Sequence, residues 1–246
     1  MDGLLADLHA IILDHLSRLE TYTIRKGRAK DEIIAEFQKD PLYSIFGLDS
    51  PEYVAAILGG GTITSIHRKI GDLYEQCVHT IIVHQLGLPA APRFTAAIVS
   101  GDVEQKRTID VYIPFDALGA KIRVRLEEIA TREVLSITAT PKVQLIGMGF
   151  EVRHCYQSAD SKRVQADEAM ARYLMFSGVL PVMLVFCNQS NRQVMTRYRG
   201  TWMLKEGMAS YHFLEEITAF SFYEFLLAHK DQYRDIVRRA LRRVSE

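Results

Sequence analysis

The segment Gly149-Phe-Glu-Val-Arg-His-Cys-Tyr-Gln-Ser-Ala-Asp-Ser-Lys-Arg163 decides how the middle of the chain folds. Its first residues alternate between apolar and charged side chains, which is typical of a short strand. Phe150 and Val152 lie on one face of this strand, and Glu151 and Arg153 lie on the other. The sequence therefore predicts a strand with one apolar face and one face that carries an acid and a base.

The second half of this segment is typical of the start of a helix. Ser158 or Asp160 can cap a helix that we predict over residues 160–175. A second apolar strand is predicted over residues 182–187, after that helix. Metal and phosphate sites of α/β sheets commonly lie where a strand passes into a helix, so we expect a functional site there.

The composition is that of an ordinary globular protein. Of the 246 residues, 48% are hydrophobic and 24% are charged, which allows one large domain or one domain with an appendage. The formal net charge is zero, so a neutral balance neither indicates nor excludes a nucleic-acid partner. No run of about 18 uncharged apolar residues is present, and we therefore expect no membrane span.

The cysteines indicate the compartment. Cys77, Cys155 and Cys187 are odd in number and far apart in the sequence. This usage suits a reducing compartment, and the spacing does not form a zinc-binding pattern. We therefore expect a cytoplasmic protein.

Two parts of the chain differ in character. Residues 1–58 are predicted to form a helical N-terminal region, which ends at the glycine run 59–61. This region is either an appendage for packing or dimerisation, or an arm that contacts DNA. Residues 59–246 are expected to form the core and the C-terminal helices, and the two parts are expected to make one compact domain.

Alternating strand and helix patterns predict an α/β fold with a mixed central sheet flanked by helices. We predict helices over residues 4–19, 30–37, 51–58, 62–86, 211–227 and 231–244. We predict strands over 94–100 and 108–113, and further strands or one long hairpin over 122–126 and 134–140. A polar turn is predicted over 101–106 and a polar loop over 188–193.

Acidic and basic residues of this pattern suit phosphodiester hydrolysis. That reaction needs a nucleophilic water and stabilisation of charge, which Mg²⁺ held by two or three carboxylates can supply beside a cation. The candidates are Glu75 on the predicted helix 62–86, Asp110 within an apolar strand, and the Glu151 and Arg153 pair. An aspartate in such a strand is locally unfavourable unless it lies at the strand end or has a partner. Lys162 at the next helix start adds a second candidate cation.

The order of these parts resembles the common core of the PD-(D/E)xK nucleases. A helix with glutamate, a strand with aspartate, a strand with Glu-x-basic, a helix and a strand follow one another over residues 62–187. The segment 152–163 resembles the ApaLI-like restriction endonucleases in particular. The resemblance implies a restriction-endonuclease-like fold and a homodimer that cleaves both strands of double-stranded DNA at a short palindrome with Mg²⁺.

The resemblance also implies roles for single residues. Asp110 matches the aspartate of the first motif, Glu151 the acid of the second, and Glu75 the helix glutamate that some members add. All three are then metal ligands. Ile109 stands where proline is usual before the aspartate, and the long gap between Asp110 and Glu151 requires an inserted hairpin.

The most serious departure is Arg153, which stands where the motif has lysine. Arginine stays protonated, so it cannot act as a base, although it can stabilise negative charge. Lys162 can take the lysine role from the helix. Alternatively, Asp160-Ser-Lys162 is itself the acid-x-lysine motif, and Glu151 is secondary. We prefer Glu151 because it lies in a strand.

Polar residues around the site and after residue 187 are candidates for DNA contacts. Amide and guanidinium groups can read base edges, although any polar loop or solvated surface has this composition. Gln157 and Ser158 either bind phosphate at the helix start or only cap it. The DNA-binding candidates are Gln157, Ser158, Arg163, Gln189, Asn191, Arg192, Arg197 and Arg199.

Two other functions remain open from the sequence. One is a repair or structure-specific nuclease with the same fold. The other is a catalytically silent DNA-binding module, which the arginine at position 153 favours.

Overall fold

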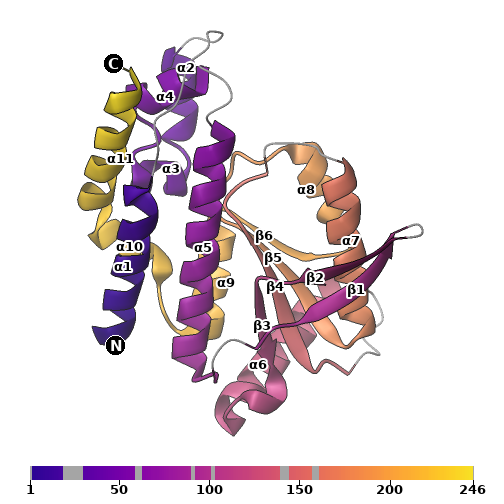
Figure 1. The fold of residues 1–246 in the computed structure, drawn as a ribbon. Helices are drawn as coiled ribbons and strands as arrows, with labels where there is room; N and C mark the ends of the chain where they lie inside the picture. Colours follow the sequence, from indigo (N-terminus) through magenta and orange to yellow (C-terminus); the bar gives the residue numbers. More distant parts are fainter. Residues whose placement is uncertain are drawn as a thin grey trace.

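The computed structural model describes residues 2–18, 30–58, 63–89, 92–100, 103–138, 144–156 and 161–245 of the chain (Figure 1). Its helices are α1 (Asp2–Ser17), α2 (Lys30–Phe37), α3 (Pro41–Phe46), α4 (Pro51–Leu58), α5 (Ile63–Leu86), α6 (Ala120–Glu133), α7 (Ser161–Phe176), α8 (Arg192–Tyr198), α9 (Met208–Thr218), α10 (Phe222–Ala228) and α11 (Lys230–Ser245). Its strands are β1 (Thr95–Ser100), β2 (Val103–Thr108), β3 (Val111–Pro114), β4 (Gly147–Arg153), β5 (Val179–Val185) and β6 (Met203–Glu206).

A mixed sheet of four strands lies at the centre of the α/β part. The strand order is β3-β4-β5-β6, in which β3 runs antiparallel to β4 and the other neighbours run parallel. Strands β1 and β2 form a separate antiparallel hairpin. The predicted α/β class, the mixed sheet and the helical N-terminal region are therefore confirmed.

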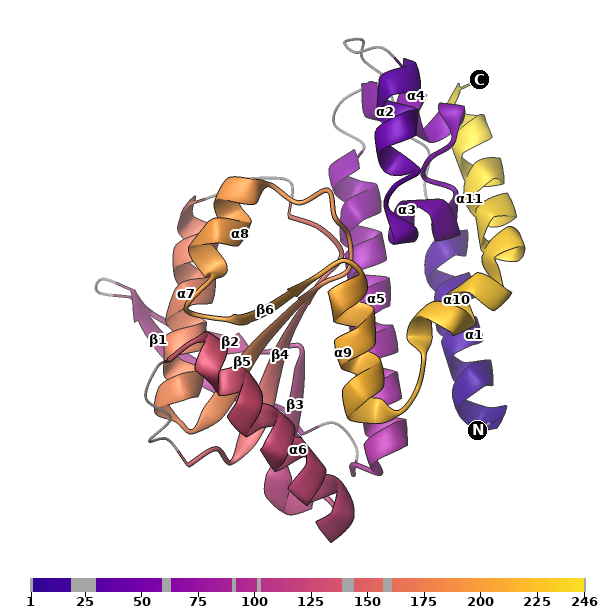
Figure 2. The ribbon, with the colours of Figure 1, turned by 180° about the vertical axis from the view of Figure 1, so that it is seen from behind.

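Helices cover both faces of the sheet, as Figure 2 shows for α5 and α9 on one side and α7 on the other. On β5, Val182 and Leu184 belong to the apolar cluster that contains α5 and α9. Met183 and Val185 belong to a second cluster with α7 and α8. A parallel strand that is covered on both faces reads as a continuous apolar run, which is why this segment shows no alternation.

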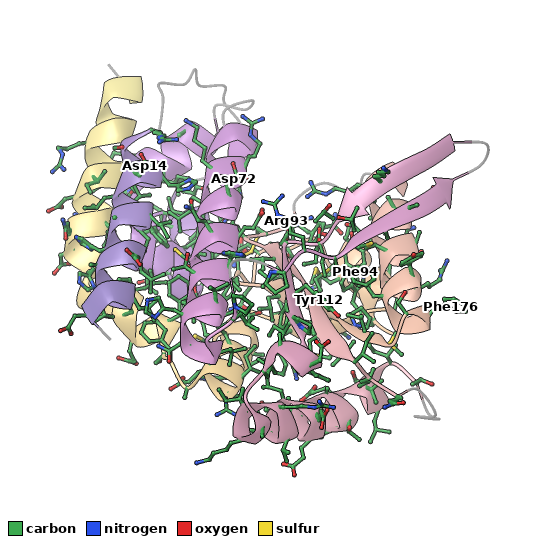
Figure 3. All side chains as sticks on the ribbon, turned by 60° about the horizontal axis from the view of Figure 1, so that its bottom comes forward. Asp14, Asp72, Arg93, Phe94, Tyr112 and Phe176 are labelled. Atoms are coloured by element: carbon green, nitrogen blue, oxygen red, sulfur yellow. A yellow bond between two sulfur atoms is a disulfide. The ribbon has the colours of Figure 1, made fainter. Side chains whose placement is uncertain are left out.

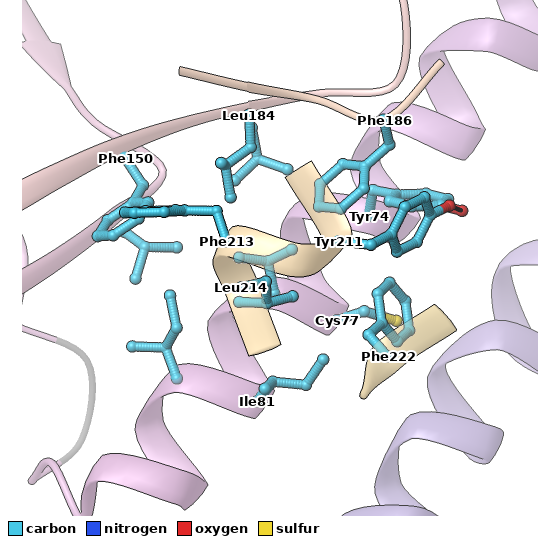
Figure 4. Close-up of a cluster of buried hydrophobic side chains, with 14 of the residues drawn as sticks. Tyr74, Cys77, Ile81, Phe150, Leu184, Phe186, Tyr211, Phe213, Leu214 and Phe222 are labelled. Carbon is cyan, nitrogen blue, oxygen red and sulfur yellow. Dashed lines mark hydrogen bonds between the residues drawn. The ribbon is translucent and has the colours of Figure 1, made fainter. Parts of the chain in front are cut away.

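Helix α5 is the central helix of the fold, since it packs against α1, α9 and the sheet. Its apolar residues recur at helical spacing along most of its length and form the faces that make these contacts. Tyr74 and Cys77 on α5 pack with Phe186, Tyr211 and Phe222 in the cluster drawn in Figure 4. The hydroxyl groups of Tyr74 and Tyr211 lie 2.6 Å apart, so each buried phenol has a hydrogen-bond partner. This packing fixes α5 against the sheet.

The N-terminal helices join the rest of the protein through apolar contacts and through one buried carboxylate. Helix α1 packs against α5, and α11 packs against α1 on its other side (Figure 1). Asp40 caps α3 by accepting a hydrogen bond from the backbone N–H of Leu42 at 3.0 Å. The same carboxylate accepts a hydrogen bond from the backbone N–H of Asn188, after β5. One side chain therefore ties the N-terminal region to the loop beyond the sheet.

The prediction of strands over residues 122–126 and 134–140 is wrong for the described residues, and positions 139 and 140 lie outside them. Residues 120–133 form α6, and Val134–Ser136 form a single 3-10 turn. Alternating Ile-Arg-Val-Arg-Leu suggests a strand, but Leu126, Ile129 and Ala130 are buried at helical spacing. Over residues 120–133 the helical spacing of the buried residues outweighs the five-residue alternation, so this segment is a helix.

Three other expectations need correction. The polar turn expected over 101–106 is largely strand, because β2 begins at Val103 and a hairpin outside the main sheet needs no apolar alternation. The polar loop expected over 188–193 is shorter, because Arg192 and Gln193 already belong to helix α8, whose start is capped by Asn191. The predicted helix 211–227 is two helices, α9 and α10, because Ala219 between them has a positive φ of 57°. Helix α3 and strand β6 were not predicted.

The turn between β6 and α9 requires glycine. Gly207 has φ 58° and ψ −130°, and a Cβ at this position would collide with the side chain of Asn188. We expect Gly207→Ala to lower the free energy of unfolding by about 2–4 kcal/mol. Gly71 lies within α5 with nothing near its missing Cβ, so Gly71→Ala should instead add about 0.5–1 kcal/mol. Urea unfolding would compare the two, and equal changes would contradict the strained turn.

Candidate functional site

Asp110 lies at the amino end of β3, in the short link that follows β2. Because β3 is antiparallel to β4 and Val111 pairs with Phe150, this end of β3 lies beside the carboxyl end of β4. One carboxylate oxygen of Asp110 accepts a hydrogen bond of 2.7 Å from the backbone N–H of Val152. An aspartate in an apolar run is tolerated here because it lies at a strand end and has a partner.

Arg153 of β4 contacts both Asp110 and Glu151, its neighbour two residues before it on the same strand. Phe150 and Val152 belong to the apolar cluster on the other face, as the alternation of the sequence predicts. Arg153 Nη1 lies 3.1 Å from Asp110 Oδ2, and Arg153 Nη2 forms an ion pair with Glu151 Oε1. The three side chains thus form one largely buried charge cluster of two carboxylates and one guanidinium.

Burial and the neighbouring charges set the protonation of this cluster. Burial raises the pKa of Asp110, while the guanidinium of Arg153 and the N–H of Val152 oppose this rise. Burial also disfavours the charge on Arg153, but Asp110 and other acidic neighbours outweigh it, so the pKa of Arg153 lies above the ordinary arginine value. Arg153 is therefore a permanent cation and cannot serve as a base.

Glu75 faces this cluster from α5 across two adjoining cavities. A cavity of about 290 Å³ is lined by Glu75, Val152, Arg153 and Arg163, among others. A second cavity of about 530 Å³ is lined by Glu75 and Asp110, together with Asp72 of α5 and Arg93, both labelled in Figure 3. Glu75 lines both cavities, and one residue of the charge cluster lines each of them: Arg153 the smaller and Asp110 the larger. The two cavities together are the cleft beside the charge cluster.

Glu75 has a carboxyl group that titrates near neutrality. Burial, followed by repulsion from Asp110, raises the pKa of Glu75 to about 7. A half-buried carboxyl with this pKa can both hold and release a proton under physiological conditions.

The raised pKa of Glu75 predicts a pH-dependent stability. The folded state holds this proton more tightly than the unfolded chain, so the resulting stabilisation is complete below about pH 4.5 and is lost as the pH rises through about 7. Glu75→Gln should remove that loss, and the variant should gain stability relative to the parent between about pH 5 and 8. Urea unfolding in EDTA would measure this gain. Glu128→Gln, at an exposed position of α6, is the control, and the same gain in both variants would contradict the assignment.

A buried aspartate that the sequence analysis missed supports the site from α7. Asp167 accepts hydrogen bonds from the hydroxyl groups of Tyr156 at 3.0 Å and Tyr198 at 2.8 Å. Arg107 of β2 reaches the other oxygen of Asp167 at 3.4 Å. This network joins β2, α7, α8 and the segment after β4. The burial of Asp167 could have been predicted from the sequence, because apolar residues such as Val164 and Ala171 lie at helical spacing on either side of it.

Two buried histidines lie at the base of the smaller cavity and were not predicted as site residues. The rings of His67 and His154 lie 4.6 Å apart, and His67 Nε2 lies 2.9 Å from the hydroxyl of Tyr53. Burial lowers the pKa of His67 to about 4 and moves the pKa of His154 well below its ordinary value. Both imidazoles are therefore neutral near pH 7 and add no positive charge to the cavity.

Two of the three cysteines are joined, which the sequence spacing did not suggest. Cys155 and Cys187 form a disulfide, whereas Cys77 is free and buried. The parallel pairing of β4 with β5 continues past the strand ends, where the N–H of Cys187 donates to the carbonyl of His154. Cysteines far apart in sequence thus meet at one sheet edge, and their spacing gives no argument for a reducing compartment.

The sequence candidates near β4 have different outcomes. Arg163 lines the smaller cavity and packs over the ring of Tyr156, 5.7 Å from its centroid. Gln157, Ser158 and Asp160 lie outside the described residues. The backbone of Lys162 belongs to α7, but its side chain lies outside the described part, so its role as the catalytic cation stays a prediction.

The candidates after β5 gather around α8 rather than beside Asp110. Asn191 accepts a hydrogen bond from the N–H of Gln193 and so caps α8. Arg197 lies 3.6 Å from Glu168 on α7. Arg192 and Arg199 line a separate polar cavity of about 390 Å³. The remaining candidate is Gln189, whose backbone N–H points to the sulfur of Cys187.

The donor set fits a magnesium ion bound by two carboxylates. Asp110 and Glu151 both contact the guanidinium of Arg153, so their oxygens lie within the span of one small group. Mg²⁺ is commonly held by one or two carboxylates and several waters. Within the described ranges, no three His, Cys, Asp or Glu side chains are placed together to hold a metal, so Glu75 does not complete a triad. A cation at the pair would compete with Arg153 for the same oxygens.

Comparison of the chain with models of protein families, with curated proteins and with solved structures finds no match. Among the helices of the described ranges, none is long and apolar enough to cross a membrane.

Proposed function

We propose that this chain is a Mg²⁺-dependent DNA endonuclease of the PD-(D/E)xK superfamily, acting as a type II restriction enzyme of the ApaLI-like kind. The proposal is carried by the meeting of Asp110, Glu151 and Arg153 at one edge of a mixed sheet, where Glu75 faces them from α5. Cleavage of both strands at a palindrome matches the two-fold symmetry of a homodimer, so a homodimer belongs to the proposal. A cytoplasmic location belongs to it only because a restriction enzyme meets its DNA there.

Each residue has a separate task in this mechanism. Asp110 and Glu151 would hold Mg²⁺, which when bound stabilises charge on the phosphate and makes a coordinated water more acidic. Arg153 remains protonated and offsets charge on the phosphate oxygens. Glu75, with a pKa of about 7, accepts a proton from water in the cleft. The N–H of Val152 keeps the Asp110 carboxylate oriented throughout.

Incubation of the purified protein with phage DNA, in Mg²⁺ and in EDTA, tests the proposal on a gel. Discrete fragments that need Mg²⁺ would support a restriction enzyme, and sequencing of their ends would give the recognition site. A smear, or cleavage confined to substrates with flaps, junctions or lesions, would indicate a repair or structure-specific nuclease instead. Intact DNA under every condition would contradict nuclease activity.

The position of Arg153 favours one other function. Its guanidinium contacts both carboxylates that a metal would need, and this contact satisfies their charge without a metal. A chain in which this contact is permanent would be a catalytically silent DNA-binding module. DNA binding without Mg²⁺-dependent nicking, tested over varied substrates, would favour this alternative.

A further inference from the structure

We propose that Arg68 of α5 and Arg163 of α7 form a clamp for one phosphate of the DNA backbone, across the cavity of about 290 Å³ that adjoins the charge cluster. This inference rests on the proposed nuclease function and deepens it, because it names the residues that position the strand. Arg163 is a candidate from the sequence, whereas Arg68 is identified only by the cavity.

The two arginines are available for a ligand. Both are exposed, both line the cavity, and neither forms a hydrogen bond or an ion pair with any residue in the described ranges. The ring of Tyr156 supports Arg163, which limits the freedom of that side chain. Arg153, deeper in the same cavity, is already engaged by Asp110 and Glu151. A free guanidinium on each of two opposed helices suits a phosphate, which accepts bidentate hydrogen bonds.

The remaining groups around the cavity favour an anion at its mouth. Asp72 and Glu75 are the carboxylates among its lining residues, against the free guanidinium groups of Arg68 and Arg163, whereas the charge of Arg153 is already paired. Helix α7 begins only two residues before Arg163, and a helix N-terminus attracts negative charge.

The size of the cavity suits this ligand. One water molecule takes about 30 Å³ in the liquid. A cavity of about 290 Å³ therefore has room for a phosphate with part of its sugar. The buried, neutral His67 and His154 close its base, so the phosphate would remain at the level of the arginines, beside Glu75 and Arg153.

Binding of a short, mixed-sequence DNA duplex in EDTA tests the clamp without cleavage, read by fluorescence anisotropy over a range of salt. Arg68→Ala and Arg163→Ala should each weaken binding on the order of tenfold and lower the salt slope by about 1. Arg68→Lys keeps the charge and should keep most of the slope. Arg172→Ala is the matched control, since Arg172 is an exposed residue of α7 that lies outside the cavity.

The outcomes separate the clamp from the nuclease proposal. If the parent cuts DNA while both alanine variants, folded by circular dichroism, bind with the affinity and slope of Arg172→Ala, the clamp is overturned and the function stands. If the parent neither binds nor cuts DNA, the proposed function fails and the clamp fails with it. Selective loss in the two cavity variants supports the clamp, whether or not cleavage is observed.

Discussion

Glu151→Gln and Asp110→Asn should each reduce Mg²⁺-dependent DNA cleavage by about a thousandfold, equivalent to about 4 kcal/mol of transition-state stabilisation. Each change removes one anionic oxygen donor of the proposed metal pair and leaves its shape nearly unchanged. The donors lie on different elements, β4 and the link before β3, and both contact the same guanidinium. Initial rates on plasmid DNA at saturating Mg²⁺ would measure the loss.

The control for this prediction is Asp116→Asn. Asp116 is an exposed carboxylate just beyond β3, so the change has the same chemistry without touching the cluster. Its cleavage rate should equal that of the parent. A Glu151→Gln protein that unfolds cooperatively like the parent, yet cleaves DNA at the parental rate, would remove Glu151 from the mechanism.

Arg153→Met should have the largest effect on stability, lowering the free energy of unfolding by about 3–5 kcal/mol at neutral pH. Asp110 and Glu151 would then be buried side by side without their cation, although methionine fills much of the same space. Burial raises the pKa of Asp110, and without the guanidinium that opposes this rise the pKa moves further up, so stability falls as the pH rises through that value. The variant should recover part of its stability near pH 4, which urea unfolding at several pH values would detect.

A surface arginine provides the comparison for Arg153. Arg123 lies 2.7 Å from Glu127 on the exposed face of α6, and exposed pairs of this kind contribute little. Arg123→Met should change the free energy of unfolding by less than about 0.5 kcal/mol, without a new dependence on pH. If the two variants behave alike, the charges around Arg153 do not act as one buried cluster.

Local periodicity was enough to predict several elements within a residue or two. Helices α2 and α4 have the predicted bounds, and α5 ends at the predicted residue, Leu86. Residues 122–126 were misread because alternation over five residues also occurs on a helix. Strand β6 is short and only its first residue is buried, so it carries almost no apolar pattern.

The sequence predicts those parts of the candidate site that depend on neighbouring residues of one strand. Alternation along β4 places Glu151 and Arg153 on one face, and a pairing strand brings Asp110 to them. Asp167 and the Cys155–Cys187 pair depend on contacts between residues far apart in the chain. Such contacts follow from strand order and helix packing, which a single sequence does not encode locally.

The disulfide turns the crossover between β4 and β5 into a covalent ring. Cys155 and Cys187 are separated by 32 positions, and all of α7 and β5 lies between them. In the oxidised protein the unfolded chain cannot open this ring, and the lost conformational entropy corresponds to roughly 3–4 kcal/mol in the chain-entropy treatment. While the disulfide is intact, denaturation can separate the elements of the ring but not the carboxyl ends of these two strands. The segment that carries Glu151 therefore stays tethered to β5 even in the unfolded ensemble.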